Sequence, residues 1–167
     1  MSSIRVFLGL GANLNPATSL RTGIQQLKRR FSGIQISPVY QAGAVGLDGP
    51  DFFNMVVAFN CDLALADLRI WIRQVEAKAG RNHDQPKPCN HGLDMDVLLY
   101  GDLVDVTGSN IPHDNILTCA YVLCPLADLI PDRQHPLKTL TIAQIWHEFA
   151  GAKNLQPVDF EFNCATI

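Results

Sequence analysis

The chain is poor in cationic side chains over a long stretch that is rich in acidic ones. Between Lys87 and Arg133 it contains no lysine or arginine, although seven aspartates fall in that interval. The net charge of the whole chain is -3, which argues against a general nucleic-acid or membrane-surface binder. Charged residues make up 17% of the chain and apolar residues 47%, a balance that excludes a disordered protein.

Paired cysteines and long apolar runs are also missing. The five cysteines are widely spread and form no Cys-x-x-Cys pair, so we expect reduced thiols rather than a disulfide framework. No apolar run approaches the roughly 20 residues that cross a bilayer, and residues 1–5 lead into a strand pattern rather than a signal sequence. We therefore expect a cytoplasmic protein with small-molecule ligands and no nucleic-acid or membrane partner, with a monomer as the simplest assembly.

Hydrophobic periodicity predicts strands and helices in a definite order. Strands are expected over residues 4–10, 34–40, 51–61, 94–100 and, briefly, 103–106. Helices are expected from Pro16 to Gly33, from a cap at Asp62 to Gly80, over about 116–126 and over 141–149. The order β-α-β-β-α-β predicts an α+β fold of the ferredoxin-like, split β-α-β type, an antiparallel sheet with helices packed on one face. A single domain covers residues 1–167, of which about 151–167 form a loosely packed extension.

Two aspartates one residue apart give the clearest chemical signal. Asp94 and Asp96 lie in the apolar run Leu-Asp-Met-Asp-Val-Leu-Leu-Tyr, whose alternation as a strand points both carboxylates at one face. Mg²⁺ prefers one or two carboxylates, with waters and substrate phosphates as its other ligands. The pair therefore predicts a divalent-metal site, and a solvated pair on an edge strand is the alternative interpretation.

Several short motifs accompany this strand in a familiar order. They are the turn Gly-Ala-Asn-Leu at 11–14, Asp-Phe-Phe-Asn at 51–54, Glu-Ala-Lys-Ala-Gly-Arg at 76–81 and Ile-Pro-His at 111–113. In this order the chain resembles the 6-hydroxymethyl-7,8-dihydropterin pyrophosphokinases of folate synthesis, from about Ile4 to Leu140. The resemblance implies transfer of pyrophosphate from ATP to the pterin, giving AMP and the pterin diphosphate. It also implies two Mg²⁺ ions held by Asp94 and Asp96, with ATP as co-substrate.

The resemblance assigns roles to further residues. The pterin ring is expected between the aromatic rings of Phe52 and Tyr121 and hydrogen-bonded by Asn54, since a flat ring gains from stacking and an amide offers both a donor and an acceptor. Phe52 also fits a core position. In the loop 41–50, the pterin-contacting residues would be Ala42, Gly43 and Val45. The catalytic residues would be Asp94, Asp96, Arg81 and His113, and the nucleotide-binding residues Arg81, Lys87, His91, His113 and Val97. Asn13 is expected to shape the first turn.

Three positions that are commonly basic in this family lack an arginine here. His91 stands three residues before Asp94, where members have an arginine, and His83 and Cys119 occupy two further such positions. Histidine is only partly protonated near neutral pH and lacks the planar fork that binds two phosphate oxygens at once. Ala42, Gly43 and Val45 also stand where members often have Thr, Pro and Leu. The sequence thus predicts a retained pterin pocket and metal pair with weakened ATP handling.

Two alternatives stay open at this point. A catalytically impaired paralogue would act as a pterin-binding protein, and an assay showing pterin binding without AMP formation would identify it. A zinc-binding loop could instead use His83, Cys89, His91 and Asp94, whose chemical types suit Zn²⁺ although their spacing matches no standard finger.

Overall fold

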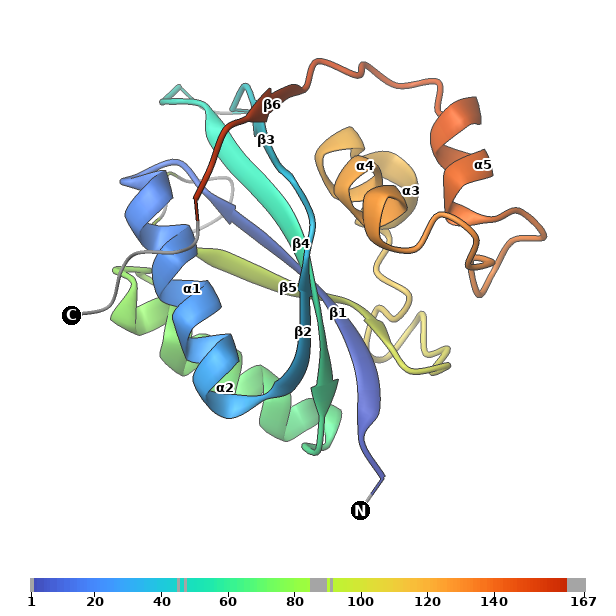
Figure 1. Cartoon of the computed structure of the whole chain (residues 1–167), viewed down its shortest axis with the longest axis horizontal. Helices are drawn as coiled ribbons and strands as arrows, with labels where there is room; N and C mark the ends of the chain where they lie inside the picture. The colour runs from blue at the N-terminus through green and yellow to red at the C-terminus, as the bar shows by residue number, and fades with distance from the viewer. Residues whose placement is uncertain (1, 45, 47, 85–89, 91, 162–167) are drawn as a thin grey trace.

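A six-stranded antiparallel sheet runs through the middle of the protein, between two groups of helices (Figure 1). The structure is a computed structural model that describes residues 2–44, 46, 48–84, 90 and 92–161. The strands are β1 (Ile4–Ala12), β2 (Ser32–Ile36), β3 (Val39–Ala42), β4 (Phe52–Cys61), β5 (Asp94–Tyr100) and β6 (Gln156–Val158). They follow the order β5-β1-β4-β3-β6, and β2 also pairs with β4. The predicted α+β class, an antiparallel sheet with helices packed against it, is confirmed.

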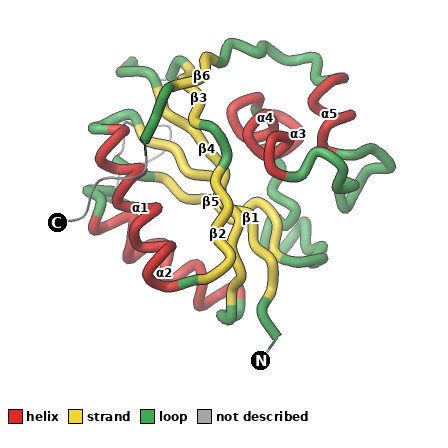
Figure 2. Tube along the Cα trace, viewed as in Figure 1, coloured by secondary structure: helices red, strands yellow, loops and turns green. Residues whose placement is uncertain are grey.

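Helices cover both faces of the sheet, and the expectation of a single helical face is wrong. The helices are α1 (Pro16–Arg30), α2 (Leu65–Lys78), α3 (Asn115–Thr118), α4 (Ala120–Leu129) and α5 (Ile142–Glu148). Figure 2 shows α1 and α2 on one side of the sheet and α3, α4 and α5 on the other. The reason is visible in β4, where Val56 and Val57 point to opposite faces and are both 0% exposed. A strand that is apolar on both faces needs a cover on each side.

The two cores follow from this alternation. On the α1 and α2 side, Val6 and Leu8 of β1 pack in one core with Leu20 and Ile24 of α1. On the other side, Phe7 of β1 packs with buried residues of α4, among them Leu123 and Leu126. None of the helices in the described part of the chain is long and apolar enough to cross a membrane.

Three of the observed elements differ in extent from the expected ones. The strand expected over 34–40 is divided at Ser37, whose Oγ accepts a hydrogen bond from the backbone N–H of Val56 at 2.9 Å. The helix expected over 116–126 is divided at Cys119, which has an extended backbone. Residues 103–106 form no strand, because only Asp105 makes an isolated bridge there, to Ile111.

The start of α2 also differs from the expectation. Its N-cap residue is Ala64, so Asp62 does not cap the helix. The carboxylate of Asp62 instead pairs with the guanidinium of Arg30 at 2.9 Å, at the end of α1. This surface ion pair joins the end of α1 to the turn between β4 and α2.

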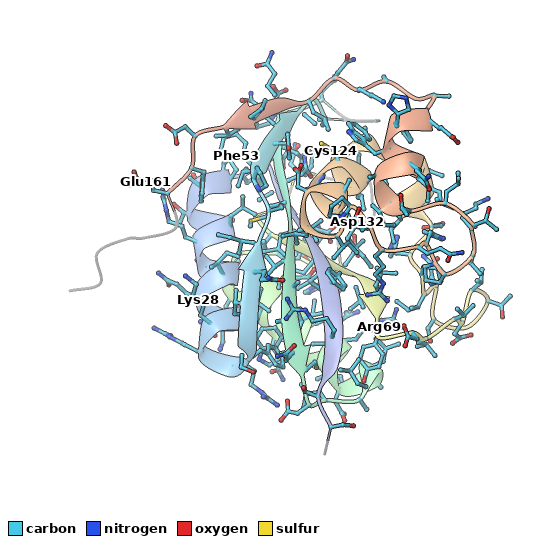
Figure 3. All side chains as sticks on the ribbon, turned by 45° about the vertical axis from the view of Figure 1, so that its right-hand side comes forward. Lys28, Phe53, Arg69, Cys124, Asp132 and Glu161 are labelled. Atoms are coloured by element: carbon cyan, nitrogen blue, oxygen red, sulfur yellow. The ribbon has the colours of Figure 1, made fainter. Side chains whose placement is uncertain are left out.

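The C-terminal segment adds a short strand to the sheet, which the sequence pattern did not predict. The strand β6 pairs with β3, which places it at an edge of the sheet. Beyond it, the ring of Phe160 meets the ring of Phe53 edge to face at 6.4 Å, and the Arg21 guanidinium lies over Phe160 at 4.8 Å. Figure 3 labels Phe53 and Glu161, which lie on the α1 side of the sheet. Residues 162–167 lie outside the described part of the chain.

The Phe160 contacts should contribute measurably to stability. Phe160→Ala removes an aromatic ring that is partly buried between Phe53 and Arg21, and we expect the free energy of unfolding to fall by about 1–2 kcal/mol. Leu137→Ala is the control, because this side chain is 48% exposed, and its effect should stay within about 0.5 kcal/mol. Urea unfolding followed by circular dichroism measures both. Equal midpoints for the two variants would contradict the packed position of residues 156–161.

Candidate active site

One line of residues crosses four strands on the face that α4 partly covers. Asp94 of β5 pairs with Gly11 of β1, Gly11 pairs with Asn54 of β4, and Asn54 pairs with Tyr40 of β3. Directly opposed residues of antiparallel strands point to the same face. Asp96 lies two residues beyond Asp94 and shares that face. The ladder therefore brings both carboxylates and the Asn54 amide to one surface, as the sequence predicts.

The Asn54 amide is held over a position that has no side chain. A Cβ atom at Gly11 would lie 3.0 Å from Asn54 Oδ1, so glycine leaves the room that this amide occupies. Asn54 is 6% exposed, and its Nδ2 has no hydrogen-bond partner within the part of the chain that is described. A buried donor without a partner costs about 1–3 kcal/mol, which an acceptor on a bound ligand would offset.

Tyr121 approaches the acidic pair from the first turn of α4. Burial raises the pKa of its hydroxyl, and a hydrogen bond to Cys119 and the negative charges of Asp96 and Asp94 raise it further. The phenol therefore stays protonated and lies close to both carboxylates. Cys119 places a thiol at the same point.

Phe52 lies on this face as well. It precedes Asn54 by two residues in β4 and pairs with Ala42 at the end of β3. The ring that packs against the α1 and α2 core is that of its neighbour Phe53. The alternation of the strand thus separates the two rings, so Phe52 is directed toward the site face rather than into that core.

Arg81 is placed by the C-terminal end of α2. Gly80 has φ +86°, the Gly80 N–H donates to the carbonyl of Ala77, and the Arg81 N–H donates to that of Glu76, which is a Schellman ending. The Arg81 side chain is 4% exposed, and its Nη1 lies 3.9 Å from Asp94 Oδ1. Its Nε and Nη1 have no hydrogen-bond partner among the described residues. A buried guanidinium with two donors that lack a partner is suited to bind an anionic group of a ligand that lies beside Asp94.

Glu76 is a site residue to which sequence reasoning gave no role. Its Oε1 accepts a hydrogen bond from the backbone N–H of Met95 at 2.8 Å, between the two aspartates, and its Oε2 lies 2.7 Å from His83 Nε2. Glu76 is buried, so it fixes the start of β5 to α2. One sign of this role was present in the sequence: Glu76 directly follows Val75 and places a carboxylate on the apolar face of the predicted helix.

His113 is fixed beside β5. Its backbone N–H donates to the carbonyl of Leu98 at 2.9 Å, and its Nδ1 accepts a hydrogen bond from the backbone N–H of Asn115 at 3.1 Å. The same Nδ1 lies 3.2 Å from Asp114 Oδ1, so contacts with two neighbouring residues hold the ring in place. Asn13 joins the neighbouring loops, because its Nδ2 donates to the Pro50 carbonyl at 3.1 Å and to Asn90 Oδ1 at 2.6 Å.

Some predicted residues are not brought to this face. The side chain of Val97 is buried in the core on the α1 and α2 side. Val45, Lys87 and His91 lie outside the described residues, as does Cys89 of the zinc hypothesis. Within the described ranges, no group of three or more His, Cys, Asp or Glu side chains could hold a metal ion.

A polar cleft of about 510 Å³ adjoins the end of β3. Ala42 and Gly43 line one side of it, and residues 153–156 line another. The C-terminal segment thus forms a wall beside two residues of the predicted pterin loop. The sequence pattern gave no sign of this wall, because it depends on the pairing of β6 with β3.

The arrangement is chemically specific. Two carboxylates on one strand face can hold a hard divalent cation whose other ligands are waters and phosphate oxygens. The buried Arg81 guanidinium adds a positive charge next to Asp94, and the aromatic rings with Asn54 suit a flat polar ring. Together, the fold and the site describe a small α+β enzyme suited to phosphoryl transfer.

Comparison with known proteins identifies the family. The family model for 7,8-dihydro-6-hydroxymethylpterin-pyrophosphokinase matches residues 7–131. The 2-amino-4-hydroxy-6-hydroxymethyldihydropteridine pyrophosphokinase of Pseudomonas aeruginosa is 34% identical over 140 residues, which cover 79% of this chain and 84% of that protein. The protein of the same name from Synechocystis sp. is 30% identical over 142 residues, covering 83% and 72%. The chain therefore belongs to the 7,8-dihydro-6-hydroxymethylpterin-pyrophosphokinase family, which confirms the predicted resemblance.

Solved structures agree with the fold. A crystal structure of the Plasmodium falciparum HPPK-DHPS triple mutant with STZ-DHP matches with a TM-score of 0.70 at 14% identity, and the wild-type protein with pteroate matches with 0.68 at 13%. Each match covers 88% of this chain, but the chain spans only 43% and 42% of those longer proteins. At such identity the likeness shows the fold alone.

The lack of a side chain at Gly11 should matter for ligand binding. Gly11→Ala brings a methyl group 3.0 Å from Asn54 Oδ1, so the amide must shift by a few tenths of an ångström. We expect the affinity for 6-hydroxymethyl-7,8-dihydropterin to fall about fivefold, the worth of one net hydrogen bond. Gly9→Ala is the matched control, since its methyl would meet Leu98 at an ordinary 3.5 Å. Titration calorimetry that gives both variants the wild-type affinity would contradict the role of Asn54.

Proposed function

We propose that this chain transfers the diphosphoryl group of ATP to the hydroxymethyl oxygen of 6-hydroxymethyl-7,8-dihydropterin. The new bond joins that oxygen to the β-phosphorus, the bond between the β-phosphorus and the oxygen of the α-phosphate breaks, and AMP leaves. The observation that carries the proposal is the line from Asp94 through Gly11 to Asn54, with Tyr121 beside it. Membership of the pyrophosphokinase family supports the same reaction.

The pterin would lie on the site face between Phe52 and Tyr121. Both rings are half-buried, so each can exchange contact with water for contact with a flat heteroaromatic ring. Asn54 would donate from Nδ2, its buried donor, and accept at Oδ1. Residues Ala42, Gly43 and Val45 would complete the pocket from the loop that follows β3.

Asp94 and Asp96 would hold Mg²⁺, two ions by analogy with the family. The fit is chemical: the carboxylates share one strand face, and the remaining ligands would be waters and phosphate oxygens. When bound, the ions supply positive charge that neutralises the triphosphate. Arg81 would add a further positive charge near the triphosphate, because its buried guanidinium lies next to Asp94.

The nucleotide would be held by few cationic side chains. Arg81 and His113 lie on the described part of the site, and Lys87 and His91 would act from the loop before β5. Val97 would contribute only through its backbone, because its side chain is in the opposite core. Cys119 supplies a thiol next to Tyr121, so we propose that ATP is bound more weakly here than by members with an arginine at that position.

The remaining parts of the proposal concern the protein as a whole. We propose a single pyrophosphokinase domain over residues 1–167 that works in the cytoplasm as a monomer, without nucleic-acid or membrane partners. The net charge of -3 and the free thiols of Cys61, Cys119 and Cys124, the cysteines that the structure describes, support this setting.

The carboxylate pair should be required for turnover. Asp94→Asn and Asp96→Asn keep the side-chain shape and remove one negative charge, so we expect AMP formation to fall at least about a hundredfold. Asp102→Asn is the control, because that side chain is fully exposed and pairs only with Arg133 at 3.6 Å within the described residues. Chromatographic measurement of AMP from the pterin, ATP and Mg²⁺ gives the rates, and thermal unfolding checks the fold.

Two outcomes would change the proposal. Wild-type rates in both aspartate variants would exclude the pair from catalysis. Pterin binding by the wild-type chain without any AMP would replace transfer by binding, as in a catalytically impaired paralogue.

Restoring an arginine should strengthen nucleotide binding. His91→Arg places a permanent guanidinium three residues before Asp94, and we expect the affinity for an ATP analogue with Mg²⁺ to rise about threefold to tenfold. His147→Arg makes the same chemical change at an exposed position of α5 and should leave the affinity unaltered. Calorimetric titration compares the two. An unchanged or lower affinity in the first variant would contradict the proposed shortage of cationic side chains.

A further inference from the structure

Tyr40 ends the line of site residues at the β3 side. It pairs with Asn54 across the ladder and shares its face. The Tyr40 hydroxyl donates a hydrogen bond to Asp128 Oδ2 at the far end of α4. The Cys124 thiol of the same helix also hydrogen-bonds with this hydroxyl. Figure 3 shows Cys124 on α4, at the end of the sheet where β3 and β6 lie.

The same side of α4 reaches both ends of the line. Tyr121 and Asp128 are seven residues apart, so they lie two turns apart on one side of the helix, about 10 Å along its axis. The line from Asp94 to Tyr40 crosses three strand spacings, roughly 14 Å. Tyr121 meets the acidic pair at one end and Asp128 meets Tyr40 at the other. The Asn54 amide lies between them.

The contacts that α4 makes with the core on its face of the sheet are mainly apolar. Val122, Leu123 and Leu126 pack against the apolar face of the sheet, and such contacts are not directional. Pro125 lies inside the helix and has no N–H to donate to the carbonyl of Tyr121, so the turn that carries Tyr121 lacks one helical hydrogen bond. A directional bond from the sheet is therefore valuable for this helix.

We infer that Tyr40 and Asp128 are positioning residues for the pterin: their hydroxyl–carboxylate bond fixes α4 and, with it, the place of Tyr121 relative to Asn54. The inference rests on the proposed function, because it defines the pterin slot of that same site. Neither residue needs to touch the reacting atoms. Burial and the bond to Asp128 both raise the pKa of Tyr40, so the donor stays protonated through the neutral range.

The test separates pterin binding from nucleotide binding. Tyr40→Phe removes only the hydroxyl, and Asp128→Ala removes the acceptor. We expect each to weaken binding of 6-hydroxymethyl-7,8-dihydropterin about threefold to tenfold, with the affinity for an ATP analogue and Mg²⁺ unchanged. Asp128→Asn keeps an acceptor oxygen and should bind the pterin nearly as well as the wild type. Both changes break the same bond. The double variant Tyr40→Phe/Asp128→Ala should therefore bind the pterin no more weakly than the single variant with the lower affinity.

A matched control removes a comparable hydroxyl elsewhere. Tyr100 donates to the carbonyl of Leu63 at 2.7 Å, at the opposite end of β5 from the aspartates. Tyr100→Phe should therefore leave pterin affinity unaltered even where it lowers the melting temperature.

The outcomes distinguish the inference from the function on which it rests. A wild-type chain that binds no pterin refutes the proposed function. A wild-type chain that binds pterin, with Tyr40→Phe binding equally well, refutes the positioning role alone. A loss shared equally by Tyr40→Phe and Tyr100→Phe, or by pterin and nucleotide, shows a general effect on the fold and also overturns the inference.

Discussion

The site depends on the register of β1 between β4 and β5. Because β1 pairs with both neighbours, its positions decide which residues of β4 and β5 meet across it, and Gly11 joins Asp94 to Asn54. A shift of one residue would turn every side chain of β1 to the opposite face. The apolar side chains of Val6, Leu8 and Leu10 prevent such a shift, since they are needed in the core with α1 and α2. The core thus determines the geometry of the polar site on the other face.

Much of the site followed from sequence because it depends on short-range alternation. The shared face of Asp94 and Asp96, and of Phe52 and Asn54, is a property of any strand with that spacing. Family resemblance then supplied Tyr121, which belongs to a helix more than twenty residues away and which the structure places near the aspartates. The roles of these residues in binding and catalysis stay proposals.

Other features could not be predicted because they depend on long-range contacts. The role of Glu76 requires that α2 end next to the start of β5, which no local pattern reveals. The break at Ser37 depends on a hydrogen bond with Val56, nineteen residues along the chain. The second helical face could not be predicted from local pattern, because β4 is apolar on both faces and its sequence does not show which helices cover each face. The C-terminal strand was missed because three residues carry almost no periodic signal.

The small strand β6 has a consequence for the behaviour of the protein in concentrated solution. An open sheet edge offers unpaired N–H and C=O groups to another chain and so promotes aggregation. Here the edge strand is only three residues long and its central residue is Pro157, which has no N–H to offer. At the opposite edge, Glu76 and His113 already bond to the backbone of β5. At β6 and at β5 the sheet is therefore protected against pairing with the strand of another molecule.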